Sequence, residues 1–583
     1  MMIGTINKKL IPMKGHYFLW NAGTGPVVPF LSTYAKQLGF SSSTVGVMYT
    51  VMPFMGMLAK PLFGAIADRY RCQKMIFLAF ILVTAAAFMA TFYSPTIEPE
   101  RKIHFACDNS FTALDTCVNN FTVSDCTAEI LHTQFENNKT RCHLNCAMSE
   151  KHFWSTICQN WNVSAYCDSS SWVDNLSFQV DIDMSHSEEI AGCVYLRVSN
   201  AIFENGVERY PNCVNSANAI FTTCDMNCES ALLNELVAQP RLNDDEVYGA
   251  YQFWLLFFFM VLGWMSQAIV VSVTDAICFE MLDNKPENYG MQRCFGALGW
   301  GLSTIIAGLL MDSFSNASSS TKNYTFVFYM ALVILILDFI LSYKLNYTQK
   351  KMSTNILRDV GSLLKNFRIV VFMVFCIFIG MCTGLIWNFL FWLIEYLAAD
   401  QGCDSMNWIK TLEGLVGAVQ CLLGELPFFF LSGWILKRIG HVNAMSLILL
   451  VIGIRYVLYS VISNPWWFLP VELTNGVTFG LFYASMASYA SIVAPSGTET
   501  TVQGLIGAIF EGIGVSLGSL VGGSMLDYYG PVLTFRIFGV ASLILCLVHA
   551  SLHYFIDRVD KDTRVEYAAP QDAITIIEKR MMR

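Results

Sequence analysis

Charged residues are scarce in this sequence: they make up 14% of its 583 residues, whereas hydrophobic residues make up 54%. A soluble protein carries about 25% charged residues, so this chain has too few to cover a water-exposed surface of its size. It contains no basic tract with interleaved aromatic residues, and we expect no nucleic-acid partner. It also lacks the phosphate-binding pattern G-x-x-x-x-G-K-[ST] and the zinc-protease pattern H-E-x-x-H. These absences argue against an ATPase and against a zinc protease.

One string, Gly514-Val-Ser516-Leu-Gly518, matches the nucleophile elbow of hydrolases. That motif works at a sharp strand-to-helix turn, whereas this copy lies in the middle of an apolar segment. Gly514, Gly518 and Gly522 instead form a stripe of small residues suited to close helix packing. We therefore expect no enzyme, no cofactor and no metal site.

Long apolar segments dominate the rest of the chain. Windows of about 20 apolar residues, the length that crosses a bilayer as a helix, predict twelve membrane spans. They lie near 15–37, 43–64, 75–94, 248–274, 291–312, 323–344, 368–396, 409–433, 442–463, 466–492, 500–526 and 531–556. The first span has no small-residue cleavage site after a short apolar core, so we interpret it as a retained helix and not as a signal peptide.

The charges in the loops between these spans are distributed unevenly. Lys and Arg gather in alternate loops, at Arg69, Arg71, Lys74, Lys350, Lys351, Arg358, Lys365, Arg368, Lys437 and Arg438. Positively charged loops stay on the cytoplasmic side of a membrane. The pattern therefore predicts a multi-pass membrane protein with both termini in the cytoplasm, and the plasma membrane is the location that we expect.

Segment 95–247, between the third and fourth spans, falls on the external side. It is polar and contains eleven cysteines, at positions 107, 117, 126, 142, 146, 158, 167, 193, 213, 224 and 228. Cysteines in an oxidising compartment predict a disulfide-rich external insert, although the sequence does not determine the connectivity. Cys403, in a later external loop, could supply a twelfth thiol, and a free cysteine is equally allowed. A zinc site at Cys142 and Cys146 with His143 is the less favoured alternative.

The external loops also carry acceptor sites for N-linked glycans. These are Asn120, Asn138, Asn162 and Asn175 in the insert, and Asn316 and Asn323 in the next external loop. We expect glycosylation at these positions because they lie on the face already predicted to be external.

A short pattern occurs twice, after the second span and after the eighth. The first copy is Gly64-Ala-Ile-Ala-Asp68-Arg69 and the second is Gly433-Trp-Ile-Leu-Lys-Arg438. Each glycine is expected to let two helices approach closely, while the cations hold the loop in the cytoplasm. Two roles for Asp68 are open: pairing with a cation across the two halves to lock the cytoplasmic side, or fixing the loop conformation alone.

This duplication divides the chain into two halves. We predict an N-terminal bundle at 1–94 and 248–344, the external insert at 95–247, a cytoplasmic linker at 345–366, a C-terminal bundle at 367–556 and a cytoplasmic tail at 557–583.

The paired loops resemble the signature of the major facilitator superfamily. Segment 289–301 resembles the fifth-helix motif of the lactose-permease-like branch, and segments 16–18, 21–23, 387–392 and 472–480 are similar to the animal major facilitator superfamily domain-containing protein 6 group. The resemblance covers all twelve spans. It implies an all-α integral membrane protein of twelve helices in two pseudo-symmetric six-helix bundles, which works by alternating access through a central cavity.

Asp275 and Arg293 are the principal candidates for a functional site. They lie 18 residues apart on either side of a cytoplasmic turn and reach about the same depth, so they can face each other. The resemblance implies a substrate site, because in lactose permease an acid and an arginine at this spacing and motif position bind the sugar. A purely structural ion pair is the alternative. Further candidates for lining the cavity are Asn21, Trp387, Asn388 and Asn475, although helix or lipid contact is the alternative for the aromatic residues.

A second group of charges lies in the C-terminal half. It comprises Glu425, Arg455, Glu472 and Glu511. The resemblance places Arg455 where the permease has the arginine of its proton-coupling network, but the histidine and glutamate of that network fall on Asn475 and Thr478. If transport is coupled to protons or another cation, Glu425, Glu472 and Glu511 remain as alternative carboxylates. Three further charges, Asp338, Glu413 and Arg536, are expected near the membrane interfaces, where their side chains reach water.

The sequence therefore predicts a secondary transporter that moves a small polar or amphipathic solute, driven by a gradient if it pumps. The alternative is a receptor or adaptor that keeps the fold, has lost transport, and binds an extracellular protein partner through its insert. The charged residues within spans favour transport, whereas the missing coupling pair and the large insert favour the alternative.

Overall fold

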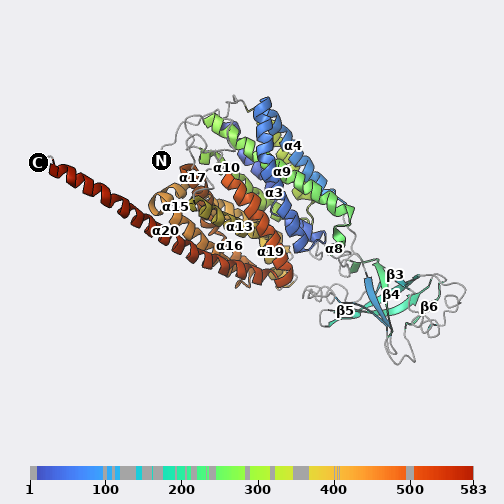
Figure 1. Ribbon diagram of the computed structural model, residues 1–583. Helices are drawn as coiled ribbons and strands as arrows, with labels where there is room; N and C mark the ends of the chain where they lie inside the picture. The colour runs from blue at the N-terminus through green and yellow to red at the C-terminus, as the bar shows by residue number, and fades with distance from the viewer. Residues whose placement is uncertain are drawn as a thin grey trace.

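The computed structural model describes most of the chain from residue 10 to residue 581. The segments outside the description are 96–101, 108–111, 118–138, 148–160, 162–174, 191–192, 204–205, 212–219, 231–232, 235–243, 283–288, 316–321, 346–366, 400, 403–404, 406 and 494–504. A bundle of helices forms one body, and strands β1–β7 form a second body at one end of it (Figure 1).

The N-terminal half of the bundle consists of seven helices within the described residues. They are α1 (Ile11–Thr24), α2 (Leu31–Gln37), α3 (Ser42–Tyr70), α4 (Gln73–Phe92), α9 (Tyr251–Leu282), α10 (Tyr289–Ser313) and α11 (Thr325–Tyr343). The first predicted span is split into α1 and α2 by a turn that contains Pro26 and Pro29. A proline in a helix interior removes a backbone hydrogen bond and clashes with the preceding turn, which explains the break.

The C-terminal half is less regular. Its α-helices are α13 (Phe367–Ala399), α14 (Ile409–Ala418), α15 (Leu426–Tyr459), α16 (Phe468–Glu472), α17 (Phe482–Val493), α19 (Ser516–Tyr529) and α20 (Pro531–Met581). Three π-helical segments interrupt them, at Val419–Glu425, Gly476–Leu481 and Ile509–Val515. Such segments are rare in proteins, and those that occur often lie at functional sites.

Nine helical segments among the described residues are long and apolar enough to cross a membrane. One of them, Ile409–Tyr459, covers two of the predicted spans, because two helices follow each other across a kink at Gly440, whose φ of 77° is not helical. A glycine adopts this positive φ without steric cost. The lengths and composition of these helices support a multi-pass membrane protein.

The prediction of an all-α protein is wrong for the insert, which forms an antiparallel sheet. Its strands are β1 (Lys102–Cys107), β2 (Thr112–Cys117), β3 (Lys139–Ala147), β4 (Asn175–Ile190), β5 (Cys193–Ile202), β6 (Glu208–Arg209) and β7 (Ile220–Cys228). The strand order is β2-β1-β7-β3-β4-β5-β6, and β2 also pairs with β5. This extra pairing closes six strands into a barrel, which removes the exposed edges that an open sheet would have.

The barrel has a hydrophobic core of its own, separate from that of the helical bundle. Phe105, Trp161 and Phe178 are buried in it with their rings in edge-on contact. Two disulfides, Cys142–Cys228 and Cys146–Cys224, join the neighbouring strands β3 and β7. Because both cysteines of the candidate zinc motif are in disulfides, that alternative is wrong. Cys403 lies outside the described residues.

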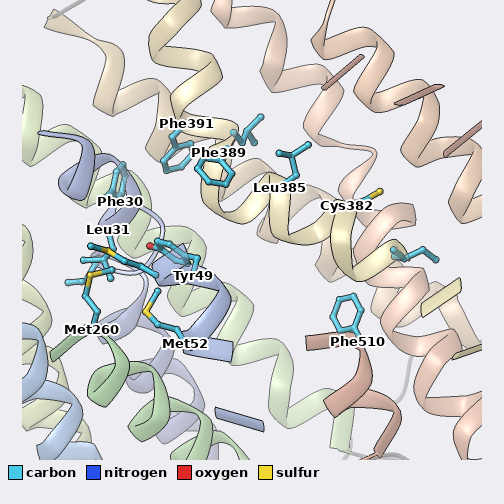
Figure 2. Close-up of a cluster of buried hydrophobic side chains, with 14 of the residues drawn as sticks. Phe30, Leu31, Tyr49, Met52, Met260, Cys382, Leu385, Phe389, Phe391 and Phe510 are labelled. Carbon is cyan, nitrogen blue, oxygen red and sulfur yellow. The ribbon is translucent and has the colours of Figure 1, made fainter. Parts of the chain in front are cut away.

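Close packing of the glycine stripe is confirmed. A Cβ atom at Gly514 would lie 2.7 Å from the carbonyl oxygen of Ile377, and one at Gly518 would lie 2.1 Å from that of Met381. Both glycines therefore let α19 and the preceding π-helical segment touch the backbone of α13. Aromatic and aliphatic side chains from both halves fill the space between the bundles, where the rings of Phe30 and Phe391 lie 5.3 Å apart (Figure 2).

Candidate functional site

Asp275 on α9 and Arg293 on α10 face each other, as their spacing predicts. The Arg293 guanidinium (Nη1) donates to Oδ2 of Asp275 at 3.1 Å. The hydroxyl of Tyr17, on α1, donates to the other carboxylate oxygen at 2.9 Å. The side chains of Asp275 and Arg293 are 26% and 35% exposed, so this pair is accessible from outside the packed helices. Solute binding by this pair remains a prediction.

An aromatic run connects this pair to the C-terminal half. The guanidinium carbon of Arg293 lies 5.4 Å from the ring centroid of Tyr483, on α17. The ring of Phe479 follows at 5.9 Å from Tyr483, and that of Trp387, on α13, at 5.7 Å from Phe479. The candidate residue Trp387 is therefore joined to the Asp275–Arg293 pair by a continuous line of side chains.

A second ion pair lies beside the first and joins the two halves. Lys60, on α3, contacts Glu511, in the π-helical segment Ile509–Val515, at 2.7 Å, and their side chains are 30% and 38% exposed. Tyr483 interacts electrostatically with Arg293, Glu511, Asp275 and Lys60, and so lies among two cations and two carboxylates. Glu511 thus belongs to this group and not to the network around Arg455.

Three of these residues were missed by the sequence reasoning. Lys60 could have been found, because it is a charged residue inside the predicted span 43–64 and such residues are usually functional or paired. Tyr17 and Tyr483 carry no comparable signal, since tyrosines are common in apolar helices.

The remaining network candidates form one buried cluster. Arg455, on α15, donates to the Glu472 carboxylate, and the two side chains are 1% and 0% exposed. Its other donor groups contact Tyr459 (2.6 Å), Asn475 (2.9 Å) and Thr478 (2.6 Å).

Glu425 and Gln420 complete this cluster. The amide of Asn475 donates to Glu425 at 3.0 Å, and that of Gln420 donates to Glu472 at 2.6 Å. Asn475, a candidate for lining the cavity, is therefore a bridge between Arg455 and Glu425. Two π-helical segments shape the cluster, because Glu425 ends one of them and Thr478 lies in another.

The two other asparagine candidates make helix contacts. Asn388 is 3% exposed and donates to the Ser519 hydroxyl at 2.7 Å, which joins α13 to α19. Asn21 donates to the carbonyl oxygen of Tyr17, one turn earlier in α1, at 2.8 Å. Neither contact involves the Asp275–Arg293 pair.

Two of the three charges expected at interfaces are fully buried, and that expectation is wrong for them. Asp338 and Glu413 are 0% exposed and are paired with His16 and Lys410 respectively. Each has a cationic or titratable partner on the same or a neighbouring helix, so neither side chain needs to reach water. Arg536 is exposed and donates to the backbone carbonyl of Ser460 at 3.1 Å.

On the side that carries the insert, a buried ion cluster joins the halves. Lys410, on α14, contacts Glu395 at 2.7 Å, Glu413 at 3.0 Å and the Thr33 hydroxyl at 3.2 Å. Lys36, on α2, contacts the other oxygen of Glu395 at 2.7 Å. Residues of α2 and α13–α14 are thereby held together.

Two aspartates near the ends of α10 and α19 make a matching pair of contacts nearby. Asp312, near the end of α10, accepts from the backbone N–H of Thr411 in the first turn of α14 at 2.6 Å. Asp527, near the end of α19, accepts from the hydroxyl of Ser42 and from the N–H of Ser43 (2.9 Å) at the start of α3. A carboxylate at a helix N-terminus satisfies free N–H groups and the helix dipole. Each contact crosses between the two halves, so the insert side is closed.

The opposite side differs. Gly64 and Gly433, the glycines of the repeated loops, have nothing within 4 Å of an added Cβ, so the predicted close approach is wrong for this conformation. Arg69 and Arg438 are exposed and lie over the rings of their neighbours Tyr70 and Trp434. The side chain of Asp68 lies outside the described residues. The helices are thus packed at the insert side, while these loops are unpacked.

The predicted glycosylation sites are mostly not described. Asn120, Asn138, Asn162 and Asn316 lie outside the described residues. Asn175 begins β4, and Asn323 is exposed just before α11.

The arrangement described above, two helical halves that meet around paired charges and are closed on one side, is that of a membrane transporter and not of an enzyme. The chain belongs to the MFS_1 like family, whose model matches residues 10–537. The resemblance to the major facilitator superfamily is thereby confirmed.

Similar proteins agree with this assignment. The chain is 22% identical to major facilitator superfamily domain-containing protein 6-like protein B of Xenopus laevis, over 91% of this chain and 88% of that protein. It is 23% identical to a maltose permease of Geobacillus stearothermophilus, over 52% of this chain and 71% of the permease. The crystal structure of the nucleoside transporter NupG matches with a TM-score of 0.57 at 12% identity, over 94% of this chain and 99% of that one. This last match shows a shared fold.

Proposed function

We propose that this secondary transporter moves a small polar solute with several hydroxyl groups, bound at the Asp275–Arg293 pair. The observation that carries the proposal is the position of that pair. It is partly exposed, it lies against Tyr483 of the opposite half, and it has a second ion pair, Lys60–Glu511, beside it.

The chemistry of these side chains suits such a solute. A planar guanidinium presents two parallel N–H donors, and a carboxylate accepts from hydroxyls, so the pair can exchange its mutual contact for contacts with a hydroxyl pair. The rings of Tyr483, Phe479 and Trp387 offer an apolar surface for one face of a sugar or base ring. Relatives named as a maltose permease and as a putative nucleoside transporter support this class of solute.

Alternating access follows from the contrast between the two sides. The insert side is held by the Lys410 cluster and by the Asp312 and Asp527 contacts, whereas Gly64 and Gly433 are unpacked. In the opposite state, we propose that the insert-side contacts break and that the repeated loops close together. Asp68 is then placed to pair across the halves.

Uptake into proteoliposomes across a panel of nucleosides, mono- and disaccharides and other polyols tests this proposal. We expect uptake of at least one of them above protein-free vesicles, and loss of that uptake in Asp275→Asn. Asn388→Ala, which removes a helix contact outside the site, is the matched control. Uptake that is unaltered in Asp275→Asn would contradict the proposed site.

The coupling ion is proposed to act in the C-terminal cluster. Arg455 contacts Glu472 and Asn475, and Asn475 donates to Glu425, so the cluster holds one guanidinium and two carboxylates. One cation cannot neutralise both carboxylates, and a proton or a small cation on Glu425 would restore neutrality. Uptake driven by an imposed pH gradient, compared with an imposed Na⁺ gradient, distinguishes the two ions.

For topology, we propose twelve membrane spans, cytoplasmic termini and a glycosylated extracellular insert at the plasma membrane. The exposed position of Asn323 and the disulfides of the insert support this orientation. Glycosidase treatment should increase electrophoretic mobility, and replacing all six acceptor asparagines by Gln should abolish the effect. A glycan at Asn346, which lies on the face assigned to the cytoplasm, would contradict it.

A second candidate function is binding of an extracellular protein by the insert without transport. The closed barrel with its own core favours it, because such a unit presents a stable surface that a simple loop does not. Two results together would favour this function. The protein would take up no solute of the panel, and a soluble protein would bind to cells that display the chain only when the insert is present.

A further inference from the structure

A buried pair of titratable groups lies in the N-terminal half, outside the site described above. Nδ1 of His16, on α1, lies 2.8 Å from Oδ1 and 3.1 Å from Oδ2 of Asp338, on α11. Both residues are 0% exposed. Nε2 of His16 lies 2.9 Å from the Thr274 hydroxyl of α9, and the hydroxyl of Ser342 lies within 3.3 Å of both partners.

The charge of this pair depends on one proton. A neutral imidazole beside an ionised carboxylate has a net charge of −1, whereas one further proton makes the pair neutral overall. An isolated net charge is very unfavourable in a site that excludes water. One further proton, carried as an imidazolium beside the carboxylate, removes this net charge and keeps the hydrogen bond between His16 and Asp338.

Among the described residues, His16 and the Ser342 hydroxyl are the side-chain partners of the Asp338 carboxylate, and no lysine or arginine forms an ion pair with it. Of the other charged groups, Lys14 of α1 lies 5.2 Å above the ring of Phe295, and Lys74 of α4 donates to the backbone carbonyl of Leu345. On α9 and α10, Asp275 and Arg293 pair with each other. The ring of Phe77, on α4, contacts the imidazole edge-on, with the two ring centroids 4.8 Å apart.

The pair is connected to the proposed solute site by adjacent residues on two helices. His16 contacts Thr274, and the next residue, Tyr17, donates to the next residue of α9, Asp275. A movement of α1 against α9 that separates His16 from Thr274 therefore also displaces Tyr17 from Asp275.

We propose that His16 and Asp338 form a proton-binding site in the N-terminal half, distinct from the Glu425 and Glu472 carboxylates. The proton is taken up from water when α1, α9 and α11 pack as in this structure, and it returns to water when they separate and the pair becomes hydrated. The link between this proton and the solute rests on the proposed function, because it acts through Tyr17 and Asp275.

The occupancy of the site can be measured without a solute. The full chain, labelled with ¹⁵N in histidine and ¹³C in the aspartate carboxyl, is reconstituted in lipid bilayers at pH 7.5 for magic-angle-spinning NMR. The His16 signals are identified by their loss in His16→Gln and, independently, by ¹⁵N–¹³C transfer to Asp338 across the 2.8 Å contact.

A histidine in water, with a pKa of about 6.5, is about 10% protonated at this pH. We expect the pair to hold the additional proton in essentially every molecule, as two N–H groups on His16 or as one N–H with a protonated Asp338. His549 is the internal control, because it is equally buried but is hydrogen-bonded to a hydroxyl, that of Ser446, and it should be neutral. One N–H on His16 together with an ionised Asp338 would overturn the proposal.

The conservative variant separates a proton site from a structural contact. In Asp338→Asn the amide keeps the shape and a hydrogen bond, and His16 should become neutral at pH 7.5. An imidazole that stays protonated in this variant would contradict the pairing argument.

Uptake then tests the link to the solute. For a solute that the wild type takes up, Asp338→Asn should weaken stimulation by an inward proton gradient while exchange without a gradient persists, and unaltered stimulation would refute the link. Absence of uptake in the wild type would refute the proposed function and leave the NMR result on the proton site valid.

Discussion

Two carboxylate–guanidinium pairs in the helical bundle differ in their surroundings and therefore in what they can do. Asp275–Arg293, in the N-terminal half, is about one-third exposed and has a tyrosine on each side. Arg455–Glu472, in the C-terminal half, is excluded from water and hydrogen-bonded on nearly every donor. A solute can replace a contact of the first pair, whereas the second can change only if helices or protons move.

The backbone differs in the same way. In the described residues, π-helical segments occur in the C-terminal half, and they contain Glu425, Thr478 and Glu511. The extra residue in such a segment rotates the following side chains relative to the preceding ones, which brings polar groups from one helix toward a common point. In the N-terminal half, Asp275 and Arg293 meet between regular helices, α9 and α10.

The largest effect should follow from breaking the buried pair. Glu472→Gln removes the carboxylate that directly contacts the buried Arg455 guanidinium, while Glu425 is separated from Arg455 by Asn475, so the change should cost about 3–5 kcal/mol of unfolding free energy. Thermal unfolding in detergent measures this loss of stability. Glu511→Gln, in the exposed pair Lys60–Glu511, is the matched control and should lower the unfolding free energy only slightly. Similar losses in the two variants would remove the distinction between buried and exposed pairs.

A comparable but smaller effect is expected at the insert side. Lys410→Met removes the cation that contacts both Glu395 and Glu413, at a cost of roughly 3 kcal/mol, since Lys36 still neutralises one of them. The halves should also separate there. The distance between spin labels on unnatural amino acids at the exposed positions 251 and 528 should increase, whereas Lys74→Met should leave it unaltered.

A helix-capping aspartate should contribute less. Asp527→Ala removes the acceptor of the Ser43 N–H at the start of α3 and should cost about 1 kcal/mol. Asp312→Ala should cost more, because the Asp312 carboxylate also pairs with the buried side chain of Lys322 at 3.0 Å. The same label pair should show a partial shift toward longer distances, and a shift toward shorter ones would contradict the proposed closure.

The smallest stability effect is expected at the exposed pair. Asp275→Asn should alter the unfolding free energy by less than about 1 kcal/mol, because water can solvate the Arg293 side chain that loses its partner. The same thermal unfolding measurement applies. A loss as large as that of Glu472→Gln would make Asp275–Arg293 a structural pair.

The sequence could predict those features that depend on position along one helix. The lengths of the apolar segments predicted the helical bundle, and the 18-residue spacing of Asp275 and Arg293 predicted that the two residues lie at the same depth in it. It could not predict which face of a helix meets which neighbour. Asp338 and Glu413 were therefore expected to reach water, although they are paired within the bundle.

The insert escaped prediction for another reason. Its strands range from 2 to 16 residues and pair in an order unlike that of the sequence, with β1 between β2 and β7. The composition shows only that the insert is polar and rich in cysteine. Closure of the barrel through β2 and β5 depends on contacts between distant segments, which composition does not reveal.

Solute binding to purified Arg293→Lys tests the central claim most directly. Lysine keeps the charge but lacks the two parallel donors of the guanidinium, so the variant should remain folded, with a melting temperature close to that of the wild type. For a solute identified by uptake, isothermal titration should show at least about tenfold weaker binding, equivalent to roughly 1.4 kcal/mol. Arg536→Lys, whose side chain is exposed at the edge of the bundle, should bind as the wild type does. Wild-type affinity in Arg293→Lys would show that the solute binds elsewhere.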